Sequence, residues 1–96
     1  MELTGDGTAR RTVVVTHPDG LHARPAALFV RAAASSAAAV SIAKEGSAPT
    51  DAKSILGVLS LDVRKDDVTE LFAQGDNAEQ VLDTLAGLLT APADNG

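Results

Sequence analysis

The sequence predicts an α+β fold in which an antiparallel sheet is covered on one face by helices. β-Branched segments alternate with alanine-rich and leucine-rich segments in the order βαββαβα, and short loops connect them. The chain has 96 residues, a length that supports one hydrophobic core in a two-layer fold. We therefore expect one domain over residues 11–89, with a flexible N-terminal extension, 1–10, and a flexible C-terminal tail, 90–96.

The first half of the domain is expected to contain two strands and the helix between them. Residues 11–16 are rich in β-branched side chains and predict the first strand. A Pro18-Asp19-Gly20 turn leads into a helix at residues 23–34, which ends at two serines. Apolar and polar side chains then alternate over residues 39–44, a pattern typical of a second strand.

The second half is expected to contain two more strands and two helices. A short third strand at 48–52 belongs at a sheet edge, because Pro49 has no N–H to pair. Ser54 is a good N-cap for a short helix at 55–61, and the fourth strand lies within residues 66–73. Asn77 can cap the last helix, with Gln80 in the capping-box position. The apolar stripe of that helix consists of Ala78, Val81, Leu82, Leu85, Leu88 and Leu89.

The composition excludes several function classes. A net charge of −5 and only two aromatic residues, Phe29 and Phe72, argue against nucleic-acid binding. No apolar run approaches the roughly 18 residues of a membrane helix, and the N-terminus lacks a signal-peptide pattern. The chain has no cysteine, and we expect neither a metal nor another cofactor. A cytoplasmic, monomeric docking or carrier module fits this small acidic chain better than a complete enzyme.

The segment from His17 to Ala27 places a histidine where a glycine-containing loop enters a helix. Pro25 suits the first helical turn, because its missing N–H leaves no bond unmade there. This position makes His22 the N-cap or its neighbour. Histidine caps helices poorly compared with serine, threonine, aspartate or asparagine, so we interpret His22 as a reactive residue.

A helix N-terminus affects an imidazole in two ways. Its partial positive charge disfavours the protonated ring, so more of the histidine is a neutral nucleophile near neutral pH. Its unpaired N–H groups can bind an anion such as a phosphoryl group attached to the ring. Arg24 adds a guanidinium suited to phosphate oxygens. The segment therefore predicts a site that carries a phosphoryl group.

Three other polar residues have simpler alternatives. We expect His17 to be an ordinary surface or loop residue, and a metal site formed with His22 and Asp19 is a weaker alternative. Arg31 lies two turns from Arg24, roughly 10 Å along the axis, so it either docks a partner or is simply solvated. Ser54 either caps its helix only or is also a site of regulatory phosphorylation.

Two segments, Gly20-Leu-His-Ala-Arg-Pro-Ala26 and Lys53-Ser-Ile-Leu-Gly-Val-Leu-Ser-Leu61, carry a family resemblance. Together they resemble HPr, the histidine-containing phosphocarrier family of the phosphoenolpyruvate-dependent sugar phosphotransferase system (PTS). The resemblance covers about residues 11–89. It implies an open-faced β-sandwich with four antiparallel strands in the order 1-4-2-3 and three helices on one face.

The resemblance also implies a stoichiometric phosphoryl carrier rather than an enzyme. Enzyme I, charged by phosphoenolpyruvate, would phosphorylate Nδ1 of His22, and IIA domains of sugar permeases would receive the group. Arg24 matches the arginine that contacts the phosphate. Ser54 matches the serine modified by HPr kinase/phosphorylase, and a transcriptional regulator is a further implied partner. The implied partner-binding residues are Ala23, Ala27, Arg31, Lys53, Ile55, Leu56 and Leu59.

Two departures from the family pattern keep alternatives open. Asp19 stands where some relatives have asparagine or serine, and its charge would repel a phosphoryl group unless it points away. Asp62 replaces a common glycine and is reminiscent of the nitrogen-branch paralogue. A carrier of a nitrogen-regulatory or dihydroxyacetone branch is therefore one alternative. A mainly regulatory HPr-like binding protein that acts through Ser54 is another.

Overall fold

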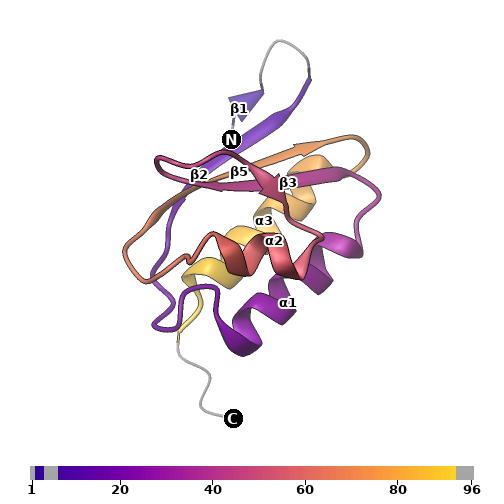
Figure 1. Ribbon diagram of the computed structural model, residues 1–96. Coiled ribbons are helices and arrows are strands. Elements are labelled where there is room, and N and C mark those ends of the chain that lie inside the picture. The colour runs from indigo at the N-terminus through magenta and orange to yellow at the C-terminus, as the bar shows by residue number, and fades with distance from the viewer. Residues whose placement is uncertain (1, 4–6, 93–96) are drawn as a thin grey trace.

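An antiparallel sheet and three helices form two layers in the computed structural model, which describes residues 2–3 and 7–92 (Figure 1). In the part of the chain that the structure describes, the three helices all lie on the same face of the sheet and no helix lies on the opposite face. This arrangement confirms the predicted α+β open-faced sandwich. Within the described residues, no helix is both long enough and apolar enough to cross a membrane.

The sheet has the strand order that the family resemblance implies. Its principal strands are β2 (Ala9–Val14), β3 (Ala39–Lys44), β4 (Thr50–Asp51) and β5 (Val68–Gln74). β5 lies between β2 and β3, and β4 pairs with the other edge of β3; every pairing is antiparallel. Numbered along the chain, these strands have the expected order 1-4-2-3.

The N-terminal segment differs from the prediction. A further strand, β1 (Glu2–Leu3), pairs with Arg10 and Ala9 inside the segment expected to be a flexible extension. A two-residue strand is too short to produce a periodic pattern in the sequence. β2 itself begins at Ala9 rather than Arg11, and Ala9 is fully buried. The strand also ends earlier than predicted, although Val15 still exchanges backbone hydrogen bonds with the residues that precede β5.

Three details near other element ends also differ from the prediction. Pro49 precedes β4 instead of lying inside it. Asn77 is the N-cap of α3 (Ala78–Thr90), but its side chain makes no capping hydrogen bond, so the predicted capping box with Gln80 is wrong. Asn77 has the left-handed φ of 62° rather than the extended backbone from which a cap side chain reaches the first turn. Thr90 belongs to α3, and residues 93–96 of the predicted tail lie outside the described residues.

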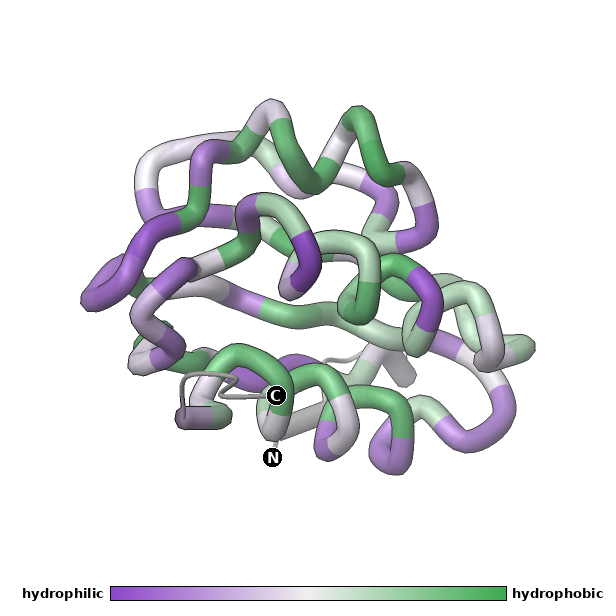
Figure 2. The backbone as a smooth tube through the Cα atoms, turned by 90° about the horizontal axis from the view of Figure 1, so that it is seen from below, coloured by the Kyte–Doolittle hydropathy of each residue, from purple (hydrophilic) through white to green (hydrophobic). Residues whose placement is uncertain are grey.

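The core lies between the sheet and the helices. α1 (Ala23–Ala34) lies between α2 (Ile55–Ser60) and α3, and hydrophobic segments occur in all three helices (Figure 2). Phe29 of α1 and Leu82 of α3 are fully buried, and burying each stabilises the fold by about 1.5–3 kcal/mol. The predicted stripe of α3 is confirmed, because its buried residues are Val81, Leu82, Leu85 and Leu89.

Gly20 joins the two loops that build the functional site. Its φ is +56°, and a Cβ at this position would lie only 2.3 Å from the carbonyl oxygen of Val63. The next residue, Leu21, donates its backbone N–H to that same oxygen at 3.0 Å. Only glycine fits this contact. The loop at residues 17–22, which leads into α1, is therefore held against the loop at residues 61–67, which follows α2.

Candidate functional site

His22 is the N-cap of α1, as predicted, but its ring does not cap the helix. Its backbone is extended, with φ −120° and ψ 156°, and its side chain makes no hydrogen bond to the first turn. The next residue, Ala23, has a left-handed φ of 52°, a conformation that costs a residue with a Cβ about 1–2 kcal/mol. The ring is therefore available for contacts outside α1.

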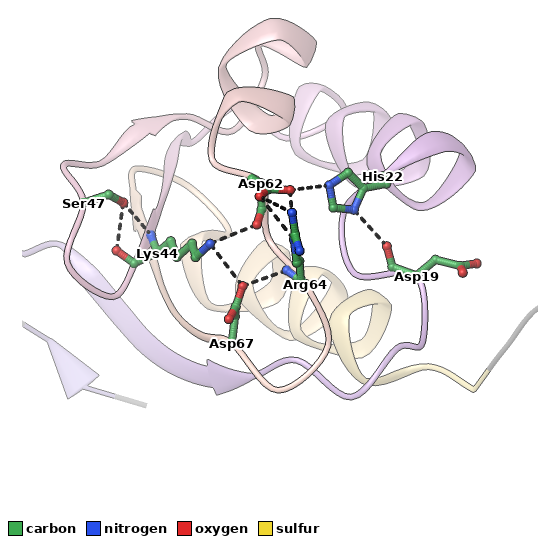
Figure 3. A network of polar contacts seen from close by, with 7 residues as sticks. All are labelled: Asp19, His22, Lys44, Ser47, Asp62, Arg64 and Asp67. Carbon is green, nitrogen blue, oxygen red and sulfur yellow. Dashed lines mark hydrogen bonds and ion pairs between the residues drawn. The ribbon is translucent and has the colours of Figure 1, made fainter.

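The two ring nitrogens of His22 face two different oxygens (Figure 3). Nε2 lies 2.8 Å from Oδ1 of Asp62, and Nδ1 lies 3.3 Å from the backbone carbonyl oxygen of Asp19. The imidazole is 44% exposed and the Asp62 side chain 48% exposed. The histidine is thus oriented by protein contacts and still reachable by a partner molecule.

Asp62 is itself held in place by Arg64. The Arg64 Nε donates to both carboxylate oxygens at 3.2 Å, and Nη2 donates to Oδ2 at 2.9 Å. These hydrogen bonds, followed by the one from His22, lower the pKa of Asp62 below its ordinary value of 3.8. Asp62 is therefore an ionised carboxylate at neutral pH. Its φ of 53° lies in the left-handed region, which aspartate adopts more readily than most residues.

A second carboxylate braces the same loop. Asp67 Oδ2 accepts the backbone N–H of Arg64 at 2.8 Å and lies 3.3 Å from Nζ of Lys44, at the end of β3. The backbone N–H of Arg64 and then Lys44 lower the pKa of Asp67 below its ordinary value. Lys44 Nζ also donates to the backbone oxygen of Asp62 at 3.0 Å. The loop that presents Asp62 to His22 is thus tied to the sheet (Figure 3).

Asp19 contributes its backbone rather than its charge to the site. Its side chain is exposed, and Figure 3 shows the carboxylate pointing away from His22. This orientation points the negative charge of Asp19 away from the imidazole of His22.

His17 lies in a loop, as one of the two expectations had it, but it is not on the surface, because it is only 6% exposed. Its ring Nδ1 accepts the backbone N–H of Asp19 at 3.0 Å, and the backbone N–H of His17 donates to the carbonyl oxygen of Leu89 at the end of α3. The ring therefore stabilises the turn that precedes His22. Its Nδ1 lone pair is occupied, which argues against the weaker alternative of a metal site.

Arg24 is exposed on the first turn of α1. It lines a surface depression of about 300 Å³ together with His17, Asp19, Leu28 and Leu88. Its contact with a phosphate stays a prediction.

The expected partner-binding residues gather on the neighbouring helices α1 and α2. Leu56 is 77% exposed, and Ile55 and Leu59 are about 40% exposed. Ala23, Ala27 and Arg31 are exposed along α1. α2 ends two residues before Asp62, whose carboxylate contacts the imidazole of His22.

Ser54 and Lys53 have structural contacts at the start of α2. Ser54 is the N-cap, as predicted, and its Oγ accepts the backbone N–H of Gly57 at 3.1 Å. Lys53 is partly buried, and its Nζ donates to the carbonyl oxygen of Ser36 at 2.9 Å, after the end of α1. This contact ties the start of α2 to the end of α1.

Asp62 and Arg64 were missed as site residues by the sequence analysis. Asp62 was noted only as a departure from a common glycine, and nothing in the spacing indicates that it contacts a histidine 40 positions away. The one signal in the sequence was a charged residue at a position that favours glycine. A residue with a Cβ is strained in such a backbone conformation, and this strain indicates that the side chain has a role.

Comparisons with known proteins agree with this geometry. A family model described as "PTS HPr component phosphorylation site" matches residues 9–91. A protein named "Phosphocarrier protein HPr" from Streptomyces coelicolor is 42% identical over 81 residues, which cover 84% of this chain and 87% of the relative. "HPr-like protein Crh" from Bacillus subtilis is 40% identical over 77 residues, which cover 80% and 89% of the two chains.

The fold agrees with solved structures as well. The crystal structure of an HPr phosphocarrier protein from Bacillus anthracis matches with a TM-score of 0.83 and 36% identity, covering 86% of this chain and 98% of that one. The family match spans nearly all of the described residues and includes His22. By sequence and by fold, this chain belongs to the PTS HPr family of phosphocarrier proteins.

Proposed function

We propose that this protein accepts a phosphoryl group on Nδ1 of His22 and passes it to a second protein. The observation that supports this most strongly is the half-exposed imidazole at the N-cap of α1, which makes no capping bond and is oriented by Asp62. A histidine that served only to cap the helix would bond to a backbone N–H of the first turn. A carrier needs a ring that is fixed in orientation and open to a partner.

The N-terminus of α1 supports the phosphorylated state. Its unpaired backbone N–H groups and partial positive charge favour an anion on the ring. Arg24, on the first turn of the helix, adds a guanidinium that can reach phosphate oxygens. The donor and acceptor proteins supply the rest of the transition-state stabilisation, so the carrier is a stoichiometric reactant rather than a turnover enzyme.

The partners in this proposal are phosphorylated enzyme I as donor and IIA domains of sugar permeases as acceptors, all meeting in the cytoplasm. Exposed apolar side chains of α2 form the docking surface, together with the exposed residues of α1. A small docking surface favours the weak and rapidly exchanging interfaces that a carrier requires.

Ser54 is proposed as a regulatory phosphorylation site for a kinase of the HPr kinase/phosphorylase type. Phosphorylation adds about −1.5 to −2 charge at neutral pH, next to the exposed Ile55 and Leu56. That charge would weaken the docking of enzyme I. It would also place an anion at the start of α2, where the Oγ of Ser54 already accepts a backbone N–H. A transcriptional regulator that reads this modification is the corresponding partner.

Intact-mass spectrometry tests the carrier function directly. The protein is mixed with enzyme I and phosphoenolpyruvate, beside a His22→Ala variant. One acid-labile phosphoryl group on the wild type and none on the variant is the expected result. No adduct from an enzyme I that phosphorylates its own HPr would contradict a role in the sugar branch. Repeating the reaction with a nitrogen-branch enzyme I then separates the other branch from a purely regulatory protein.

A further inference from the structure

We infer that Asp62 is a positioning residue for phosphoryl transfer: its carboxylate keeps a proton on Nε2 of His22 and so leaves Nδ1 as the nucleophile. This inference rests on the proposed carrier function and goes beyond it, because it names a residue that selects the reacting nitrogen. It assigns a role to the aspartate that stands where a glycine is common.

Nε2 of His22 lies 2.8 Å from Oδ1 of Asp62, within hydrogen-bonding distance. An ionised carboxylate can only accept hydrogen bonds. This carboxylate is ionised at neutral pH, and the hydrogen bonds from Arg64 lower the pKa of Asp62 further below its ordinary value of 3.8. Nε2 must therefore carry a proton. The opposite tautomer would set the Nε2 lone pair against a negative charge at hydrogen-bonding distance.

The second ring contact gives the competing arrangement. The carbonyl oxygen of Asp19 can accept a hydrogen bond from Nδ1 only if Nδ1 carries a proton. A doubly protonated ring can donate a hydrogen bond to both oxygens, whereas a neutral ring has one N–H and can donate to only one of them. The contact with Asp62 is charge-assisted and short, at 2.8 Å, and the contact with Asp19 is neutral and long, at 3.3 Å. The neutral ring therefore keeps its proton on Nε2 and presents a free lone pair at Nδ1.

The position of Asp62 is fixed by contacts that do not involve the histidine. Its side chain is held by Arg64, its carbonyl oxygen accepts from Lys44, and its neighbour Val63 accepts from Leu21. The whole arrangement lies at the junction of two loops that Gly20 brings together. Because these hydrogen bonds hold the Asp62 carboxylate independently of His22, the carboxylate sets the orientation of the imidazole.

The transfer step can be written without moving a proton. The Nδ1 lone pair forms a bond to phosphorus while the bond between phosphorus and the donor breaks, and the donor atom keeps the electron pair of that bond. The proton stays on Nε2, so the phosphorylated ring is cationic and faces the negative charge of Asp62. In the onward transfer, a nucleophile of the acceptor protein forms a bond to phosphorus while the electrons of the N–P bond return to Nδ1, and the ring leaves as neutral imidazole. If Nε2 had lost its proton, the leaving group would be an imidazolide anion, which leaves far less readily.

The test compares Asp62→Gly with Asp66→Gly. Both substitutions remove one negative charge from the same loop, and both replace an aspartate at positive φ with the residue best suited to that backbone. Asp66 is a matched control, because its side chain is 80% exposed and its carboxylate lies 4.0 Å from Nζ of Lys65. Both variants are therefore expected to fold.

The first readout is the tautomer of His22, measured from its ring ¹⁵N shifts at a pH high enough for the ring to be neutral. The wild type and Asp66→Gly should hold the Nε2–H tautomer. In Asp62→Gly the ratio of Nε2–H to Nδ1–H should fall by about two- to fivefold, a size set by the half exposure of the pair. A ratio unchanged from that of Asp66→Gly would overturn the inference.

The second readout uses phosphoramidate, a small phosphoryl donor that needs no partner protein. The wild type and Asp66→Gly should be phosphorylated at Nδ1, while Asp62→Gly should react about two- to fivefold more slowly there and also form the Nε2 product. The same site pattern in all three proteins would count against Asp62. Neither readout depends on enzyme I, so a failure of the proposed carrier function would be recognised separately from a failure of this inference.

Discussion

Nε2 of His22 and Oδ1 of Asp62 are 2.8 Å apart, although the two residues are separated by 40 positions in the chain. One residue begins α1 and the other follows α2. They meet because the backbones of two loops make contact at Gly20 and Val63. The chemistry of this site therefore depends on a glycine that has no functional group.

Replacing Gly20 by alanine should disrupt that contact. The added Cβ would lie 2.3 Å from the Val63 oxygen at a positive φ, and we expect a loss of at least about 2 kcal/mol in the free energy of unfolding. Gly46→Ala is the matched control, since Gly46 also has a positive φ but no atom within 4 Å of the added Cβ. It should lose only about 1 kcal/mol. Urea unfolding measures both, and equal losses would show that the close contact is unimportant.

Ser54 substitutions should separate helix capping from regulation. Ser54→Ala removes the Oγ that accepts from Gly57 and should destabilise the protein by about 1 kcal/mol, with little effect on phosphoryl transfer. Ser54→Asp retains a capping oxygen and adds a negative charge, so it should preserve stability and raise the KM of enzyme I for the carrier. Thermal unfolding and steady-state kinetics measure the two effects. A normal KM for Ser54→Asp would contradict the regulatory role.

The exposed apolar surface of α2 should matter for docking and not for stability. Leu56 is 77% exposed, so Leu56→Ala should change the free energy of unfolding by less than about 0.5 kcal/mol. The same substitution should raise the KM of enzyme I for the carrier. Leu82→Ala is the contrasting variant, because Leu82 is fully buried, and it should cost about 2–5 kcal/mol. If Leu56→Ala is phosphorylated with an unchanged KM, the docking surface lies elsewhere.

Acid should remove the stabilisation that comes from Asp67. Its pKa in the folded protein is lowered below the ordinary 3.8, chiefly by the backbone N–H of Arg64. A carboxyl with a depressed pKa stabilises the folded state above its unfolded pKa, and this contribution is lost as the pH falls through the folded pKa. The wild type should therefore exceed Asp67→Asn in stability at pH 7, and the difference should shrink as the pH falls below 3.8. Urea unfolding from pH 7 to pH 2.5 measures this difference in stability. A difference that grows in acid would contradict a lowered pKa of Asp67 in the folded protein.

Much of the fold could be predicted because its signals are local. The apolar stripe of α3 and the alternation of apolar and polar residues in β3 are patterns within short segments of the chain. Ser54 likewise caps α2 by accepting a hydrogen bond from a residue only three positions away. The position of His22 as the N-cap of α1 could also be predicted, since Pro25 indicates where the helix starts.

The remaining features depend on contacts between distant residues. β1 forms only because β2 offers a free edge, and His17 is buried only because the end of α3 packs beside its loop. The orientation of the His22 ring depends on Asp62, Arg64 and Lys44, which come from two other parts of the chain. Neither a periodic pattern nor a short motif in the sequence predicts such contacts between distant residues.

The most direct test of the account identifies the nitrogen that carries the phosphoryl group. The ring nitrogens of His22 are labelled with ¹⁵N, the protein is phosphorylated by enzyme I and phosphoenolpyruvate, and the coupling between phosphorus and nitrogen is measured by NMR. We expect a phosphorus atom bonded to Nδ1, with Nε2 still protonated and facing Asp62. A phosphorus atom bonded to Nε2 would contradict it, because that nitrogen is the one that the carboxylate holds.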